Sequence, residues 1–155
     1  MDFVPVFKDP ADESRQTVWF IFKRQRILID CRNGTCILPE DRTLGDHGIF
    51  PINRLFIGFL GDKGCYAAEL PAGDDAPAPF AWVDLRLLLD TISEDLFWVA
   101  GLANHLLDWD RSHRYCGQCG QPTADKTDER AKHCPACGLV NYPRLSPAVI
   151  MAVVK

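Results

Sequence analysis

The sequence has no long hydrophobic run and no excess of positive charge. Its longest apolar clusters, VWFIF at 18–22 and LFIGFLG at 55–61, fall far short of the roughly 20 residues that a membrane-spanning helix needs, so we expect no membrane segment. The formal net charge of −4 argues against a general nucleic-acid binder, which needs clustered lysines and arginines. The start, MDFVPVFKDPADESR, lacks the basic and apolar stretches of a secretory signal, so we expect a cytoplasmic location.

The composition is that of a folded protein, with 47% hydrophobic and 25% charged residues. Short β-branched and aromatic runs separated by polar turns predict antiparallel hairpins in the first half of the chain. These runs are TVWFIF and RILID on either side of residues 23–25, and RLFIGFL and CYAAEL on either side of the turn GDKG. The fold class that we expect is α+β, with a small antiparallel sheet followed by one helix.

The helix is predicted over residues 91–109, where the hydrophobic period changes from two to between three and four. Thr91 followed by Glu94 fits a capping box, in which each side chain satisfies an open backbone N–H at the helix start. The apolar face that should pack on the sheet comprises Leu96, Val99, Ala100, Ala103, Leu106 and Leu107.

Four of the seven cysteines form the pattern C-x2-C-x14-C-x2-C, and they are Cys116, Cys119, Cys134 and Cys137. Two residues between thiols allow a tight turn to point both sulfurs at one ion, and two such turns complete the tetrahedron that Zn²⁺ prefers. Four thiolates leave no open position for water or substrate, so the zinc is expected to be structural and not catalytic. Pairing as disulfides is the alternative, which a reducing compartment disfavours.

The other three cysteines, Cys31, Cys36 and Cys65, are scattered. Cys31 and Cys36 flank the turn RNGT and could approach each other across a hairpin, but we interpret them as small, partly buried thiols.

The local charge of the cysteine segment differs from that of the whole chain. Between residues 111 and 144, six lysines and arginines stand against three acidic residues. This excess could face a phosphate-bearing ligand, or it could be the solvated surface of an ordinary module.

The runs WDRSHRYCGQCG, CPACG and NYPRLSPAVI resemble the zinc-ribbon segment of the NADH pyrophosphatase subfamily of Nudix hydrolases. The similarity extends from DLFWVAG to the end of the sequence, whereas the first 90 residues resemble the leading domain of that family only in size and hairpin pattern. The resemblance implies a homodimeric enzyme that cleaves the pyrophosphate of NAD(H) to nicotinamide mononucleotide and AMP, and that in some members removes NAD caps from RNA.

The chemistry of that family depends on a glutamate-rich Nudix box that holds Mg²⁺ or Mn²⁺ against the diphosphate. This sequence has five glutamates and no two are adjacent, so we expect no catalytic residue in it. The domains that follow are an N-terminal α+β domain over 1–110, a zinc ribbon over 111–144, and the first strand of a truncated Nudix domain over 145–155.

The resemblance also implies three substrate contacts, at Glu129, Tyr142 and Arg86. A carboxylate accepts hydrogen bonds from an amide or a ribose hydroxyl, and a tyrosine offers a stacking face with a polar tip. Arg86 matches a family arginine with the register off by one. The structural alternatives are an exposed glutamate, a core tyrosine and a surface arginine.

Two other functions compete with the enzyme. One is a stand-alone zinc-ribbon module that binds nucleic acid or protein, and the other is a scaffold for dimerisation only. The acidic net charge and the apolar run at the end of the sequence both weigh against a stand-alone module.

Overall fold

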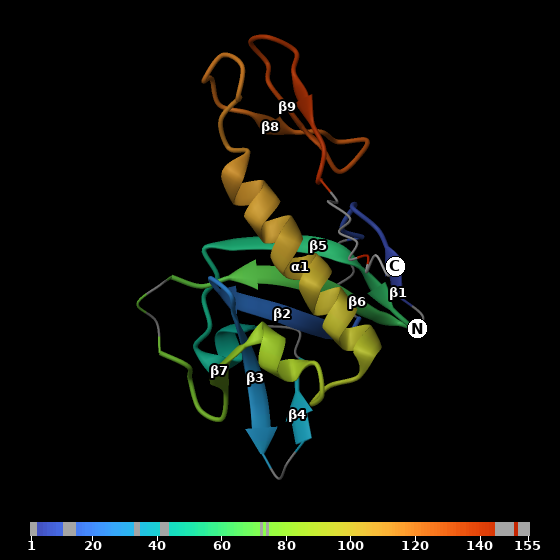
Figure 1. Cartoon of the computed structure of the whole chain (residues 1–155), viewed down its shortest axis with the longest axis vertical. Coiled ribbons are helices and arrows are strands. Elements are labelled where there is room, and N and C mark those ends of the chain that lie inside the picture. The colour runs from blue at the N-terminus through green and yellow to red at the C-terminus, as the bar shows by residue number, and fades with distance from the viewer. Residues whose placement is uncertain are drawn as a thin grey trace, which may run out of the picture. The chain divides into compact units, whose positions relative to one another are not determined.

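The computed structural model describes residues 3–10, 15–32, 35–40, 44–71, 73, 75–144 and 151, and the chain divides into two compact units, residues 1–111 and 112–155 (Figure 1). The first unit contains a seven-stranded sheet with the strand order β1-β5-β6-β2-β3-β4, in which β7 also pairs with β3. The strands are β1 (Phe3–Pro5), β2 (Thr17–Lys23), β3 (Arg26–Arg32), β4 (Thr35–Ile37), β5 (Asn53–Leu60), β6 (Lys63–Glu69) and β7 (Ala81–Asp84). Its helices are the 3-10 helices η1 (Leu44–His47) and η2 (Leu85–Leu88) and the α-helix α1 (Glu94–Ser112).

Both predicted hairpins are confirmed. β2 and β3 are antiparallel with Phe22 opposite Ile27, and β5 and β6 are antiparallel with Leu60 opposite Lys63. The two hairpins are joined by a parallel pairing of β2 with β6, which was not predicted. Hydrophobic patterns identify strands and their turns, but they do not show which strands become neighbours when the connection is long.

A bulge in β5 allows the N-terminal strand to pair with the sheet. The register of β5 on β6 shifts between Phe56 and Gly58, and Gly58 has a φ of 147°. A Cβ atom at this position would lie 2.2 Å from the carbonyl oxygen of Val4 in β1. Only glycine therefore permits the backbone approach that places β1 beside β5.

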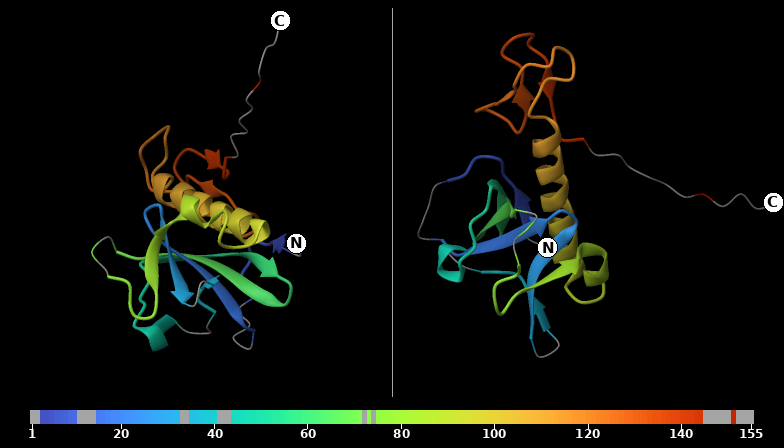
Figure 2. Two further views of the ribbon diagram at one scale, coloured as in Figure 1. Left: turned by 60° about the horizontal axis from the view of Figure 1, so that its bottom comes forward. Right: turned by 90° about the vertical axis from the view of Figure 1, so that its left-hand side faces the viewer.

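Two hydrophobic clusters cover the two faces of the sheet. α1 packs on one face, where Val99, Ala100, Ala103, Leu106 and Leu107 are buried and Leu96 is partly buried, which confirms the predicted apolar face (Figure 2). The second cluster lies on the opposite face and contains Trp19 and Ile21 of β2 together with Leu44 of η1. The α+β class is confirmed, and β2 reads as a continuous apolar run because both of its faces are buried.

The start of α1 differs from the predicted capping box. Ser93 is the residue that caps the helix, because its Oγ accepts a hydrogen bond from the Leu96 N–H at 3.3 Å and its carbonyl accepts from the Phe97 N–H at 3.0 Å. Thr91 instead donates its hydroxyl to the carbonyl of Leu87 at 3.2 Å. Ser93 is therefore the N-cap of α1, and the predicted capping box of Thr91 with Glu94 was wrong.

The interpretation of Cys36 as a free thiol was also wrong. Cys36 forms a disulfide, and its backbone lies opposite that of Cys31 in the pairing of β3 with β4. Cys65 is free and fully buried, and burial raises the pKa of its thiol to about 12, so it is not a nucleophile.

Two expectations concern membrane crossing and the end of the chain. In the part of the chain that the structure describes, no helix combines the length and the apolar character that crossing a bilayer demands. The strand expected over 145–155 lies outside the described residues, apart from Met151, which is exposed.

Candidate metal centre and the adjacent carboxylate

The second unit carries a three-stranded antiparallel sheet with the order β10-β9-β8. Its strands are β8 (Ala124–Asp125), β9 (Lys132–His133) and β10 (Val140–Asn141), each of two residues. Because such short strands bury little surface, the two cysteine loops and the chain between them must be held in another way.

The two cysteine loops have the same backbone geometry. The Gly120 N–H donates to the Cys116 carbonyl and the Gly138 N–H donates to the Cys134 carbonyl, both at 2.9 Å. Gly120 has a φ of 74° and Gly138 a φ of 78°, a conformation that a residue with a Cβ atom adopts only with strain. Each loop thereby turns back past its own sulfurs.

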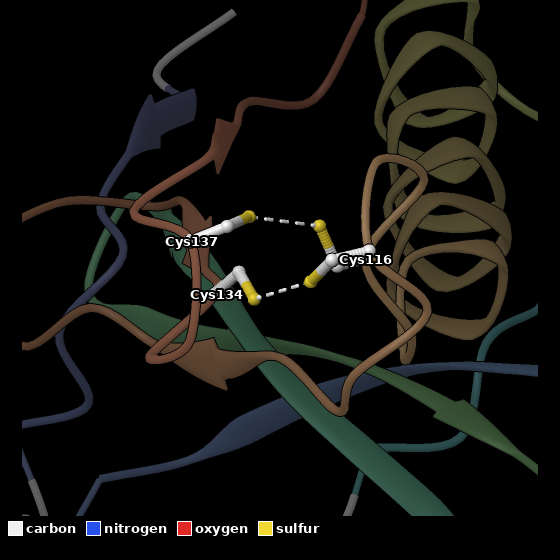
Figure 3. A group of neighbouring side chains, drawn as sticks. Cys116, Cys134 and Cys137 are labelled. Carbon is white, nitrogen blue, oxygen red and sulfur yellow. Dashed lines mark hydrogen bonds between the residues drawn. The ribbon is translucent and has the colours of Figure 1, made fainter.

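The four sulfurs converge on one point, as Figure 3 shows for Cys116, Cys134 and Cys137. The Sγ atoms of Cys116 and Cys137 are 3.5 Å apart, those of Cys119 and Cys134 are 3.5 Å apart, and all four lie within 4.8 Å of one another. A tetrahedral zinc with Zn–S bonds of about 2.3 Å requires sulfur–sulfur edges of about 3.8 Å. The donor set and its spacing therefore fit Zn²⁺.

The pKa values of these thiols are shifted by nearby backbone N–H groups and by the neighbouring sulfurs. Backbone N–H groups of Cys119 and Gln118 lower the pKa of Cys116 to about 6, and the N–H of Cys137 likewise lowers the pKa of Cys134. For Cys137 the backbone N–H of Leu139 lowers the pKa, but the contact with the Cys116 sulfur, burial and the contacts with the Cys119 and Cys134 sulfurs together outweigh it, so the pKa rises to about 12. Four thiolates at this spacing repel one another unless a cation lies between them.

A second group of side chains lies in the ribbon, in the loop between β8 and β9 and just after β10. Tyr142 donates its hydroxyl to Glu129 Oε1 at 3.0 Å, so the structure brings together two of the three residues that the family resemblance implied. The Lys126 ammonium donates to the same oxygen at 2.5 Å. The hydrogen bond from Lys126, followed by that from Tyr142, lowers the pKa of Glu129, whereas the bond to Glu129 raises the pKa of Tyr142.

Neither Glu129 nor Tyr142 is a core residue. Tyr142 is 52% exposed as a residue and the Glu129 side chain is 38% exposed, which leaves the pair open to a ligand. Sequence reasoning placed Lys126 only in a general basic excess and missed its contact with Glu129. No local sequence pattern indicates this contact, because it depends on the shape of the loop between β8 and β9.

Arg86 lies in the first unit, on η2, and its side chain is exposed. Its backbone N–H donates to the Asp84 carboxylate at 2.9 Å, which caps this short helix. A substrate contact at Arg86 stays a prediction.

Comparison with known proteins places both units in one family. Residues 16–109 match the family model described as an NADH pyrophosphatase-like rudimentary NUDIX domain, and residues 111–142 match the NADH pyrophosphatase zinc ribbon domain. The chain belongs to the NADH pyrophosphatase family. The zinc-ribbon match of this family member spans all four cysteines as well as Glu129 and Tyr142, and the other match extends the similarity across the sheet and α1, beyond what the sequence motifs showed.

Relatives of this NADH pyrophosphatase family member carry the name NAD-capped RNA hydrolase NudC. The Deinococcus radiodurans protein is 35% identical over 152 residues, which are 98% of this chain and 50% of the relative. The Stutzerimonas stutzeri protein is 37% identical over 140 residues, or 85% of this chain and 46% of the relative. The chain thus spans about half the length of these relatives.

Proposed function

We propose that this chain is the N-terminal and zinc-ribbon part of a Nudix hydrolase that cleaves the pyrophosphate of NAD(H) to nicotinamide mononucleotide and AMP, and that also acts on NAD-capped RNA. The observation that carries the proposal is the exposed pair of Glu129 and Tyr142 on a four-cysteine ribbon of this family. The names of the relatives support the two substrates, because both contain the NAD moiety.

In this proposal the chain contributes substrate contacts and a zinc-stabilised scaffold. The four thiolates of the ribbon close the coordination sphere of the zinc, so that ion stabilises the ribbon and activates no water. Diphosphate cleavage needs divalent ions held by several carboxylates, and the five glutamates of the sequence are dispersed. We therefore assign Mg²⁺ or Mn²⁺ and the catalytic residues to a Nudix domain that follows residue 155.

Residues 1–110 then form the N-terminal domain, 111–144 the zinc ribbon and 145–155 the first strand of the Nudix domain. Arg86 is included among the substrate contacts because a guanidinium binds phosphate oxygens well. We also infer a homodimer, which the family resemblance implies, and a location in the cytoplasm, which the start of the sequence favours because it lacks the pattern of a secretory signal.

The test is to read the coding sequence beyond Lys155 and to express the complete protein. We expect a glutamate-rich box there, Mg²⁺-dependent cleavage of NADH by the complete protein, and none by residues 1–155 alone. In the complete protein, Glu129→Ala and Tyr142→Ala should impair hydrolysis while the zinc content stays unchanged. Robust magnesium-dependent cleavage by residues 1–155 would show that the active site lies within these residues, and the proposal would then be wrong.

A further inference from the structure

Lys126 lies in direct contact with the carboxylate of Glu129. Its ammonium nitrogen lies 2.5 Å from Glu129 Oε1 and 3.6 Å from Asp128 Oδ1, and its side chain is 26% exposed. We propose that Lys126 is a positioning residue: together with Tyr142 it fixes one oxygen of Glu129, and the second oxygen is left to accept a hydrogen bond from an uncharged N–H or O–H group of the dinucleotide. This inference rests on the proposed function.

The first argument is the convergence of both donors on a single oxygen. The Lys126 ammonium and the Tyr142 hydroxyl both donate to Oε1, and among the described residues Oε2 has no hydrogen-bond partner. A carboxylate has about four acceptor positions, so Oε2 keeps its full capacity. An exposed glutamate normally samples several rotamers. Two donors on one oxygen, one from the loop between β8 and β9 and one from the residue after β10, restrict where the other oxygen points.

The second argument is the charge of the group. Lys126, followed by Tyr142, favours the ionised form of Glu129, while the charge of Asp128 opposes it. An ionised carboxylate accepts hydrogen bonds and donates none, so its partner in the ligand must be a donor. A dinucleotide offers such donors in its carboxamide, its exocyclic amine and its ribose hydroxyls, whereas a phosphate or carboxylate group would be repelled.

The same geometry argues against Lys126 as a phosphate ligand. Its ammonium lies between the carboxylates of Glu129 and Asp128, so its charge is compensated within the ribbon. A lysine that captures phosphate presents an uncompensated charge. Among the positive charges between residues 111 and 144, Lys126 is therefore paired with the Glu129 carboxylate and is not available to a phosphate group.

Backbone hydrogen bonds hold the part of the loop that carries Lys126 and Glu129. The Lys126 N–H donates to the Ala131 carbonyl and the Ala131 N–H donates to the Glu129 carbonyl, both at 2.9 Å. These bonds close the loop on itself immediately before β9. The backbone positions that carry Lys126 and Glu129 are thus held by a hydrogen-bonded turn.

The test uses zinc-loaded residues 1–155, with NAD⁺ as the probe and backbone amide NMR shifts of the ribbon as the signal. We expect NAD⁺ to shift the amides near Glu129 and Tyr142, and Lys126→Met to weaken its binding about tenfold, which corresponds to the loss of one well-placed hydrogen bond. Lys126→Arg, which can still donate to Oε1, should restore most of the affinity. Asp128→Asn is the matched control, because it removes the other carboxylate beside Lys126 and keeps the contact with Glu129.

A second measurement follows the Glu129 carboxyl carbon in unliganded protein labelled with ¹³C at the glutamate side chains, with assignment by Glu129→Gln. The carboxyl should titrate at a higher pH in Lys126→Met than in wild type, and Lys126→Arg and Asp128→Asn should leave it low. Equal titration and equal NAD⁺ affinity in wild type and Lys126→Met would overturn the inference, as would the absence of any ribbon shift with NAD⁺. These failures differ from failure of the proposed function, which would appear as a complete protein that binds NAD⁺ but does not hydrolyse it.

Discussion

The two units of the chain are stabilised by different means. In the first unit, large side chains such as Phe20, Phe22 and Ile29 are 0–1% exposed, and two hydrophobic clusters cover both faces of the sheet. In the described part of the ribbon, the buried residues are Cys116, Ala131, Lys132 and Cys134. A ribbon with so little buried apolar surface depends on its metal, whereas the sheet and α1 depend on packing.

The sharpest way to test this contrast is to remove the metal. Chelation, or Cys134→Ser, should unfold the ribbon and leave the first unit folded, because zinc binding and ribbon folding are one equilibrium with an apparent energy of about 10–16 kcal/mol in zinc-finger peptides. Amide NMR should show the signals of 116–142 collapsing to unfolded positions while those of 17–109 persist. We also expect one zinc per chain in the freshly reduced wild-type protein.

Well-formed Cys116–Cys119 or Cys134–Cys137 disulfides without metal, in freshly reduced protein, would contradict this prediction. Loss of the first unit together with the ribbon would contradict the contrast itself. Cys65→Ser is a control for the loss of a thiol, because Cys65 lies in the first unit and its loss should not change the zinc content.

The reverse experiment is to open a cavity in the first unit. Phe20 is 0% exposed in the cluster beneath α1, so Phe20→Ala should lower the free energy of unfolding of this unit by about 3–5 kcal/mol. Zinc content and the ribbon amide signals should remain those of wild type. The measurement is denaturant unfolding followed by circular dichroism, with zinc analysis of the same samples, and loss of zinc in this variant would show that the units do not fold independently.

A smaller effect is expected at the bulge of β5. Gly58→Ala should cost about 1–3 kcal/mol, because the residue has a positive φ and its new Cβ atom would meet the Val4 carbonyl. Release of β1 from the sheet relieves the clash, so hydrogen exchange should increase at the amides of Phe3, Val4 and Val6 and of β5. Gly73→Ala is the control, because nothing lies within 4 Å of its Cβ position.

The difference between local and long-range constraints explains which features could be predicted from the sequence. The cysteine spacing identified the metal ligands because the constraint is local: two residues between thiols and a glycine after each pair fit one geometry. The helix face was predictable from its period for the same reason. The parallel pairing of β2 with β6 and the contact of Lys126 with Glu129 were not, because the first depends on a long connection and the second on the shape of a loop.

The wrong inferences have physical causes of the same kind. Cys36 was assigned a free thiol from the expected redox compartment, yet the β3–β4 hairpin sets its backbone directly opposite Cys31 and Cys36 is disulfide-bonded. An argument from the surroundings of a protein was here weaker than one from strand geometry. The capping box failed because several residues near a helix start can fill the same role, and small differences in backbone position decide among them.

The smallest expected effect concerns that helix start. Ser93→Ala should lower the free energy of unfolding of the first unit by about 1 kcal/mol, because the Leu96 N–H loses its side-chain acceptor, and Ser93→Asp should restore it. Thr91→Ala is the matched control and should cost less, since it removes one exposed hydrogen bond to the Leu87 carbonyl and leaves the cap intact. Denaturant unfolding at constant zinc resolves this difference. A larger loss for Thr91→Ala than for Ser93→Ala would mean that the helix begins as the sequence pattern predicted and that Ser93 is not its cap.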